Sequence, residues 1–128
     1  MVLIIDDNKD LAGIIFEYLN MVGYEADVAF SGEEGIAKAK QHKPGAILCD
    51  IGMSGMKGYD VAEYIRRDAE LKDVYLIAIS GYSSQSDVER SLKAGFNKYL
   101  SKPINFDYLK KVLDNLGANR VHLIHRNE

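Results

Sequence analysis

Five polar residues of this sequence stand at the end of a short apolar run or directly after one. Asp6 and Asp7 follow the first run, Asp50 and Ser80 follow the third and fourth, and Lys102 follows the fifth. Three carboxylates brought together repel one another, so such a cluster makes chemical sense around a divalent cation. A ligand set made only of oxygen favours Mg²⁺ or Mn²⁺ over zinc. An aspartate nucleophile with a lysine and a hydroxyl beside it suits phosphoryl transfer.

The apolar runs that precede these residues have the length of β-strands. They lie at 2–5, 25–29, 46–49, 75–79 and 98–100. The first, third and fourth are almost continuously apolar rather than alternating, which is typical of parallel strands covered on both faces.

Longer amphipathic stretches separate the runs and predict five helices. The first carries an apolar stripe that should face the core, and Gly23 should end it. The stripe consists of Leu11, Ile14, Ile15, Tyr18, Leu19 and Val22. The others are expected near 32–41, 59–68, 85–94 and 106–115. Ser31 should cap the helix near 32–41, and Asn105 should cap the one near 106–115. In the helix near 59–68, the side chains expected to face inward are Val61, Tyr64 and Ile65. Gly117 should end the last helix.

Alternation of strand and helix five times over predicts an α/β fold, a doubly wound parallel sheet. In such folds, ligands bind beyond the carboxyl ends of the strands. The acidic residues, Ser80 and Lys102 are therefore expected to converge at one edge of the sheet.

Length and composition set the outer limits of the interpretation. The chain has 128 residues, a net charge of −3 and one cysteine, Cys49. The length fits one domain of 1–117 with a short tail at 118–128. The net negative charge argues against a nucleic-acid partner or a membrane partner, and a single cysteine excludes a disulfide framework. We expect a cytoplasmic protein in which Cys49 is a small buried residue that points away from the site.

Four short motifs, taken together and in order, identify a family resemblance. They are Ile5–Asn8, Cys49–Ile51, Ile79–Tyr82 and Tyr99–Pro103. The chain resembles the receiver domains of two-component response regulators, of the chemotaxis-regulator-like kind, including receivers attached to hybrid histidine kinases. The resemblance implies a five-stranded (βα)5 flavodoxin-like fold with strand order 2-1-3-4-5.

The resemblance also implies roles for the acidic residues. Asp50 resembles the phosphoacceptor, and Asp7 resembles the direct ligand of a Mg²⁺ ion (Mn²⁺ being the other candidate). Asp50 and the backbone carbonyl of Gly52 complete the implied ligand set, and Asp6 acts through water.

The remaining implied roles concern the switch. Ser80 resembles the hydroxyl residue that turns toward the phosphoryl group, and Lys102 resembles the lysine that binds a phosphoryl oxygen. Tyr99 resembles an aromatic residue that moves between exposed and buried positions, and Pro103 matches a cis-proline site.

Two residues of the loop after Asp50 depart from the family pattern. Ser54 stands where the family usually has proline, which should loosen the loop. Lys57 stands where the family usually has aspartate, which reverses a charge near a helix start. In this family, the positions where Gly52 and Tyr82 stand influence how easily water reaches the acyl phosphate, so the resemblance implies that these two residues bear on its lifetime.

The function implied by the resemblance is a signalling switch that helps catalyse its own phosphorylation and dephosphorylation. A histidine kinase or a histidine phosphotransfer domain would supply the phosphoryl group, and the surface of the fourth helix, fifth strand and fifth helix would respond. A fused kinase or output domain, and a monomer or a phosphorylation-linked dimer, are compatible with it.

Other functions remain open at the level of sequence. One is an interaction module that no longer switches. Another is a small aspartyl-phosphate phosphohydrolase, although such enzymes usually carry a second aspartate where Gly52 stands. A flavodoxin-like mononucleotide binder is set aside, because it would need a phosphate-binding loop where this chain has Asp6 and Asp7, which would repel phosphate unless a metal intervened.

Overall fold

A computed structural model describes residues 1–82 and 84–119, which form five strand–helix units. The strands are β1 (Val2–Ile5), β2 (Ala26–Ala29), β3 (Ala46–Asp50), β4 (Tyr75–Ser80) and β5 (Lys98–Ser101). The helices are α1 (Lys9–Met21), α2 (Gly32–His42), α3 (Gly58–Arg67), α4 (Gln85–Ala94) and α5 (Phe106–Asn119).

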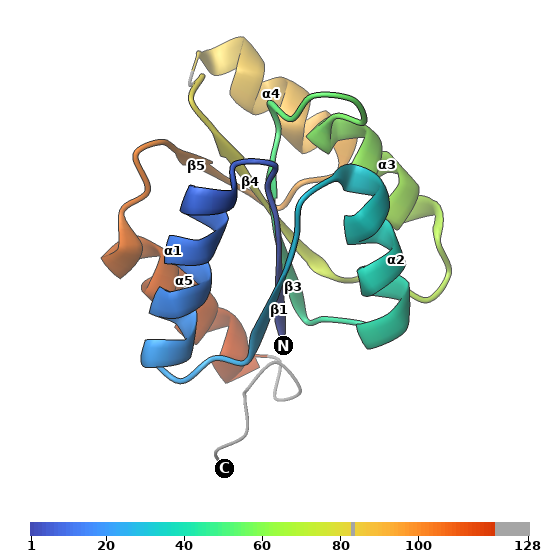
Figure 1. The fold of residues 1–128 in the computed structure, drawn as a ribbon. Helices are drawn as coiled ribbons and strands as arrows, with labels where there is room; N and C mark the ends of the chain where they lie inside the picture. Colours follow the sequence, from blue (N-terminus) through green and yellow to red (C-terminus); the bar gives the residue numbers. More distant parts are fainter. Residues whose placement is uncertain (83, 120–128) are drawn as a thin grey trace.

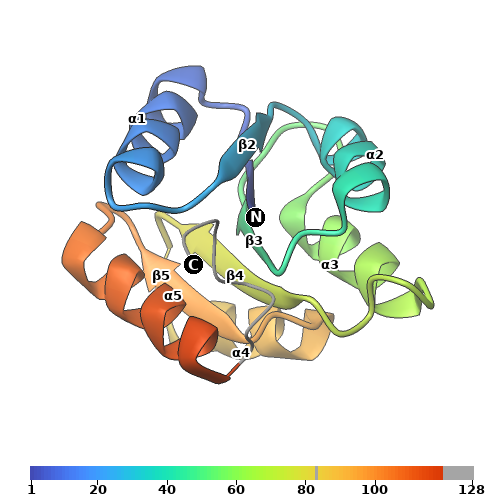
Figure 2. The same ribbon diagram turned by 90° about the horizontal axis from the view of Figure 1, so that it is seen from below.

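The strands form one parallel sheet with the order β2-β1-β3-β4-β5, which confirms the predicted topology (Figure 1). Helices α1 and α5 cover one face of the sheet, and α2, α3 and α4 lie on the other side (Figure 2). The carboxyl ends of the strands and the loops that leave them therefore share one edge, the upper one in Figure 1.

Alternate strand residues supply two separate cores, because successive side chains of a strand point to opposite faces. Val2 and Ile4 belong to the core beneath α1 and α5, whereas Leu3 and Ile5 belong to the core beneath α2 and α3. All four are fully buried. Because β1 is buried on both faces of the sheet, it is apolar at every position.

Capping side chains begin the helices where the sequence predicts them. The Ser31 hydroxyl accepts a hydrogen bond from the backbone N–H of Glu34 at 3.1 Å, at the start of α2. The Asn105 side chain accepts one from the N–H of Tyr108 at 3.0 Å, at the start of α5. Each bond satisfies a backbone donor that lacks a partner in the first turn of a helix.

Three expectations about the helices are wrong. Ile14 is 53% exposed and Tyr64 is 39% exposed, although both were expected to face inward. Each directly precedes a fully buried isoleucine, and one residue of an α-helix turns the side chain by about 100° away from it. The last helix also continues through Gly117 to Asn119, so the predicted domain end at 117 falls inside α5. The rest of the predicted tail, 120–128, lies outside the described residues.

Among the described residues, no helix combines the length and the apolar character that crossing a lipid bilayer requires.

The start of α3 packs directly against the strand that carries Asp50. A Cβ at Gly58 would lie 2.7 Å from the carbonyl oxygen of Asp50 and 2.7 Å from the Cα of Ile51. Because both neighbours are backbone atoms, Gly58→Ala should lower the free energy of unfolding by about 2 kcal/mol. Chemical denaturation measures this change.

Gly13 provides the matched control within α1. A Cβ there meets no atom within 4 Å, so Gly13→Ala should raise the free energy of unfolding by about 0.5–1 kcal/mol. Equal effects of the two substitutions would contradict the packing described for Gly58.

Candidate functional site

The register of the sheet aligns the ends of the four strands that carry the predicted residues. Ile5 of β1 pairs with Cys49 of β3, so Asp6 and Asp50 follow at the same level. Ser80 of β4 pairs with the last residue of β5, directly before Lys102. The backbone N–H of Lys102 donates to the carbonyl oxygen of Ser80 at 2.8 Å, which extends this alignment by one residue.

Strand alternation explains which of these side chains meet. Asp6, Asp50 and Lys102 each lie two residues beyond a side chain of the core beneath α1 and α5. Those core residues are Ile4, Leu48 and Leu100. The three polar side chains should therefore leave the sheet on the same side. Cys49, one residue out of phase, is fully buried in the opposite core, as predicted, and burial raises the pKa of its thiol.

Three carboxylates form the centre of the site. One oxygen each from Asp6, Asp7 and Asp50 lie within 4.8 Å of one another. Asp6 is 0% exposed, and its Oδ1 accepts a hydrogen bond from the N–H of Asn8 at 2.9 Å. Its Oδ2 is buried and accepts no hydrogen bond from the described residues. A buried carboxylate oxygen without a partner, in a residue grouped with two further carboxylates, marks a place where a cation would be stabilised.

Burial raises the pKa of the Asp6 carboxyl from 3.8 to about 6, and the nearby charge of Asp50 adds to this effect. The N–H of Asn8 and the charge of Lys102 oppose it. At neutral pH, Asp6 is therefore ionised at a cost to the folded protein.

Both oxygens of Asp50 have partners that fix the carboxylate. The side chain lies at the floor of the site, and the residue is 6% exposed. Oδ1 accepts a hydrogen bond from the N–H of Gly52 at 2.9 Å, and Oδ2 lies 3.3 Å from the Nζ of Lys102. Lys102 offsets the negative charge while the group stays accessible from the loop side.

Asp7 reaches the site from the exposed β1–α1 loop. Its Oδ2 accepts two hydrogen bonds from Ser54 in the β3–α3 loop, one from the backbone N–H and one from the hydroxyl, both at 3.1 Å. The contact of Ser54 with Asp7 is not predicted from the sequence, where Ser54 stands out only as a substitute for proline. A serine has both donors that proline lacks, and that difference was the available signal.

Ser80, at the end of β4, lines the site together with Asp50 and Lys102. Its Oγ accepts a hydrogen bond from the N–H of Tyr82 at 2.9 Å, and the Tyr82 side chain is 71% exposed. A cleft of about 370 Å³ is lined by Asp50, Gly52, Ser80, Gly81, Tyr82 and Lys102. A group that enters this cleft would meet the carboxylate, the hydroxyl and the ammonium at once.

The two remaining predicted residues lie on or just after β5. The peptide bond between Lys102 and Pro103 is cis. The ring of Tyr99 packs against the core beneath α2 and α3, and its hydroxyl is buried without a hydrogen-bond partner among the described residues. This inward position leaves a polar group unsatisfied, which disfavours it by a few kcal/mol at most.

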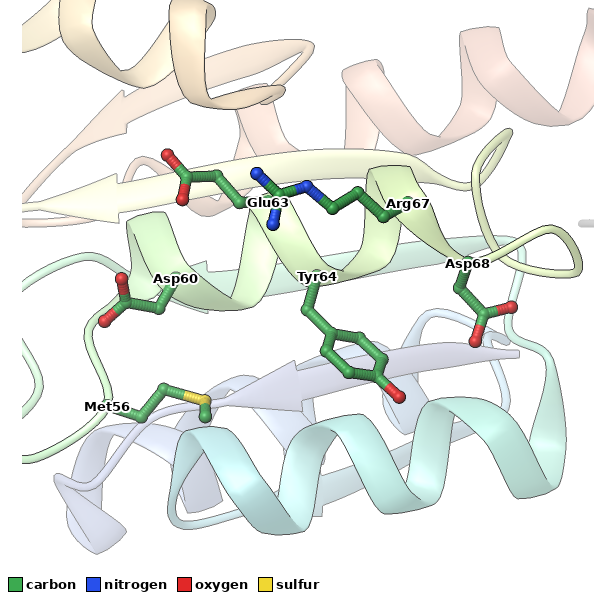
Figure 3. Close-up of a pocket in the computed structure, with 6 residues that line it drawn as sticks. All are labelled: Met56, Asp60, Glu63, Tyr64, Arg67 and Asp68. Carbon is green, nitrogen blue, oxygen red and sulfur yellow. The ribbon is translucent and has the colours of Figure 1, made fainter.

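A larger hollow of about 520 Å³ lies away from this site, between α2 and α3 (Figure 3). Its lining consists of Met56, Asp60, Glu63, Tyr64, Arg67 and Asp68. Figure 3 shows the Tyr64 ring pointing toward α2. None of the residues predicted from the sequence to carry chemistry lines this hollow.

Comparison with known proteins identifies the class that this fold and site define. Residues 2–114 match the response regulator receiver domain family. The chain belongs to this family of two-component signalling domains. Receiver domains bind Mg²⁺ at an acidic pocket, and Asp6, Asp7 and Asp50 form such a cluster here.

Curated relatives include proteins of very different length. The polar-differentiation response regulator DivK of Brucella ovis is 32% identical over 81% of this chain and 85% of that protein. The hybrid signal transduction histidine kinase G of Dictyostelium discoideum is 32% identical over 91% of this chain, which spans only 4% of the kinase. The transcriptional regulatory protein ZraR of Salmonella typhimurium is 29% identical over 92% of the chain, which spans 26% of that regulator.

Solved structures show the same architecture. The chemotaxis protein CheY4 of Vibrio cholerae has a TM-score of 0.85 at 26% identity, covering 90% of this chain and 96% of that one. A response regulator from Chloroflexus aurantiacus has a TM-score of 0.85 at 29% identity, covering 91% and 96%. These similarities agree with the flavodoxin-like fold expected from the sequence.

The raised pKa of Asp6 makes stability depend on pH in a defined direction. Between pH 3.8 and about 6, Asp6 is protonated in the folded state but ionised in the unfolded state. Ionised Asp6 therefore lowers the free energy of unfolding by its full amount above this pH range and not at all below it. In buffer with EDTA at pH 7.5, Asp6→Asn should raise the free energy of unfolding by ~1–3 kcal/mol.

Urea denaturation at a series of pH values measures the effect, and the gain should disappear as the pH falls to 4. Glu17→Gln, which removes an exposed carboxylate of α1, is the control and should change little at either pH. A gain that does not vary with pH, or a loss at pH 7.5, would show that Asp6 is not strained by burial.

Proposed function

We propose that Asp50 is the phosphoacceptor of this receiver domain. In the proposed reaction, which depends on Mg²⁺, a phosphoryl group passes from a phosphohistidine of a partner protein to Asp50. The observation that carries the proposal is the convergence on Asp50 of Lys102, at 3.3 Å, and of two further carboxylates within 4.8 Å. An isolated acid at the end of a strand would need neither a lysine nor further carboxylates beside it.

The proposed metal site follows from the donors available. All three carboxylates supply oxygen, and the buried Oδ2 of Asp6 lacks a hydrogen-bond partner among the described residues. Asp7, Asp50 and the carbonyl of Gly52 would hold Mg²⁺ or Mn²⁺ directly, and Asp6 would act through water. When bound, the ion supplies positive charge that offsets the negative oxygens of the transferred group.

The chain's own residues then account for the transfer. A carboxylate oxygen of Asp50 attacks phosphorus in line, an O–P bond forms, and the P–N bond to the donor histidine breaks. The electron pair leaves with the imidazole, which takes up a proton. Lys102 exchanges its contact with Asp50 for one with a phosphoryl oxygen, and Ser80 donates its hydroxyl hydrogen to another.

The proposed response begins at Ser80. Its Oγ is held by the N–H of Tyr82, so a turn toward the phosphoryl group pulls on the β4–α4 loop. Tyr99 is the second element, since its buried hydroxyl lacks a partner among the described residues. Two positions of this ring with similar free energy would allow phosphorylation to shift the population at the α4–β5–α5 surface.

Receiver domains interact with histidine kinases or phosphotransfer proteins and also occur joined to output domains. We propose a cytoplasmic histidine kinase or histidine phosphotransfer domain as the partner of this chain. The chain spans a small part of two of its relatives, which fits a fused kinase or output domain as well as an independent regulator.

Neither alternative function gains support from a specific observation. The phosphohydrolase interpretation expects a second acid two residues after Asp50, and that residue is Gly52. The non-switching interpretation expects a site residue to be missing, yet the sequence carries Asp7, Ser80 and Lys102.

Intact-mass spectrometry tests the proposal directly. Incubation with acetyl phosphate and Mg²⁺ should add one phosphoryl group, which Asp50→Asn and EDTA should each abolish. Lys102→Ala should lower the rate of phosphorylation by roughly 10²–10³-fold, because one preorganised charge on the transferring group is lost.

Glu63→Gln, on the far side of α3, is the control and should be phosphorylated at the normal rate. A phosphoryl group that persists in Asp50→Asn would move the acceptor to another residue. Multiple turnover of a phosphate monoester would instead revive the phosphohydrolase interpretation.

A further inference from the structure

Ser54 is the only described residue that forms hydrogen bonds to the side chain of Asp7. Its backbone N–H and its hydroxyl each donate to the same oxygen, Oδ2, at 3.1 Å. The two residues are 47 positions apart and belong to different loops, β1–α1 and β3–α3. The bonds are therefore a tertiary link and not part of a local turn.

Two donors on one oxygen restrict how the carboxylate can rotate. An ionised carboxylate has about four lone-pair positions, and these bonds use two of them on Oδ2. The whole of Oδ1 stays available to a cation. Because Asp7 is exposed, water would otherwise compete for its oxygens and leave the side chain free to take several rotamers.

The same link also sets the distance between two loops. Ser54 lies two residues after Gly52, whose carbonyl is a proposed cation ligand, and Gly52 in turn donates its N–H to Asp50. Through Ser54, Asp7 is tied to the loop that carries Gly52 and that begins directly after Asp50, the third proposed ligand. Hydrogen bonds that orient metal ligands commonly contribute 10–100-fold to metal affinity.

We propose that Ser54 is a positioning residue of the cation site: it fixes the Asp7 carboxylate against the β3–α3 loop so that the ligands are arranged before the ion arrives. The inference rests on the proposed cation site. In this proposal the hydrogen bonds from Ser54 to Asp7 persist when the ion binds, and they strengthen binding. If these bonds had to break before the ion could bind, Ser54 would instead compete with the ion for Asp7.

Binding of Mn²⁺ to the full chain, followed by electron paramagnetic resonance, tests the proposal without reference to activity. Ser54→Ala removes the hydroxyl and keeps the N–H, and it should weaken binding by about 3-fold. Ser54→Pro removes both donors and should weaken binding by about 10-fold or more. Ser54→Thr keeps both donors and should bind Mn²⁺ within about 2-fold of the unaltered chain. If the other two variants weakened binding only by disturbing the packing of the loop, the larger threonine would be expected to weaken it as well.

Two controls separate this inference from the site on which it rests. Ser86→Ala, on exposed α4, should bind Mn²⁺ like the unaltered chain, and Asp7→Asn should bind at least 100-fold more weakly. If Asp7→Asn weakens binding but Ser54→Ala and Ser54→Pro do not, the positioning role is wrong and the cation site stands. Tighter binding by either Ser54 variant also overturns the role, because Ser54 would then compete with the ion. A chain that does not bind Mn²⁺, or binds it independently of Asp7, overturns both.

Discussion

Repulsion among three carboxylates is the constraint on which the rest of the site depends. Asp6, Asp7 and Asp50 contribute oxygens within 4.8 Å of one another, and two of these residues are buried. Burial and like charge both disfavour ionisation, which is why the pKa of Asp6 rises to about 6. The chain limits this cost with backbone N–H groups and the ammonium of Lys102, but it leaves the Oδ2 of Asp6 without a hydrogen bond from the described residues. An arrangement held at such a cost is expected where it serves a function.

The fold makes this arrangement possible through the register of a parallel sheet. Because β1 and β3 are neighbours and pair level with each other, Asp6 and Asp50 emerge side by side. Lys102 emerges on the same side from β5, two strands away from β3, and its long side chain spans the gap. The two cores, one on each face of the sheet, hold the strand ends that carry Asp50 and Asp6. The loops that carry Asp7, Ser54 and Tyr82 complete the site beyond those ends.

Much of this could be predicted from the sequence, because it follows from periodicity. Apolar runs and helical stripes predicted the parallel α/β sheet, and placing Asp6, Asp50 and Lys102 at strand ends predicted where they converge. Ile14 and Tyr64 were misplaced because an apolar side chain next to a buried one extends a stripe in the sequence without facing the core. The contact of Ser54 with Asp7 was out of reach, since it joins two loops whose paths no periodicity determines. Helix α5 continues through Gly117 to Asn119, because glycine can adopt the helical conformation as well as end a helix, so one glycine does not fix where a helix ends.

The central claim is that the acidic edge of the sheet holds a divalent cation beside the phosphoacceptor. Crystals grown with Mn²⁺ and measured at the manganese absorption edge test it most directly, because anomalous scattering locates the ion without assumptions about activity. The account predicts one strong anomalous peak bound by Asp7, Asp50 and the carbonyl of Gly52. A peak that is absent from this edge at saturating Mn²⁺, or one held by other residues while these carboxylates stay free, would contradict it.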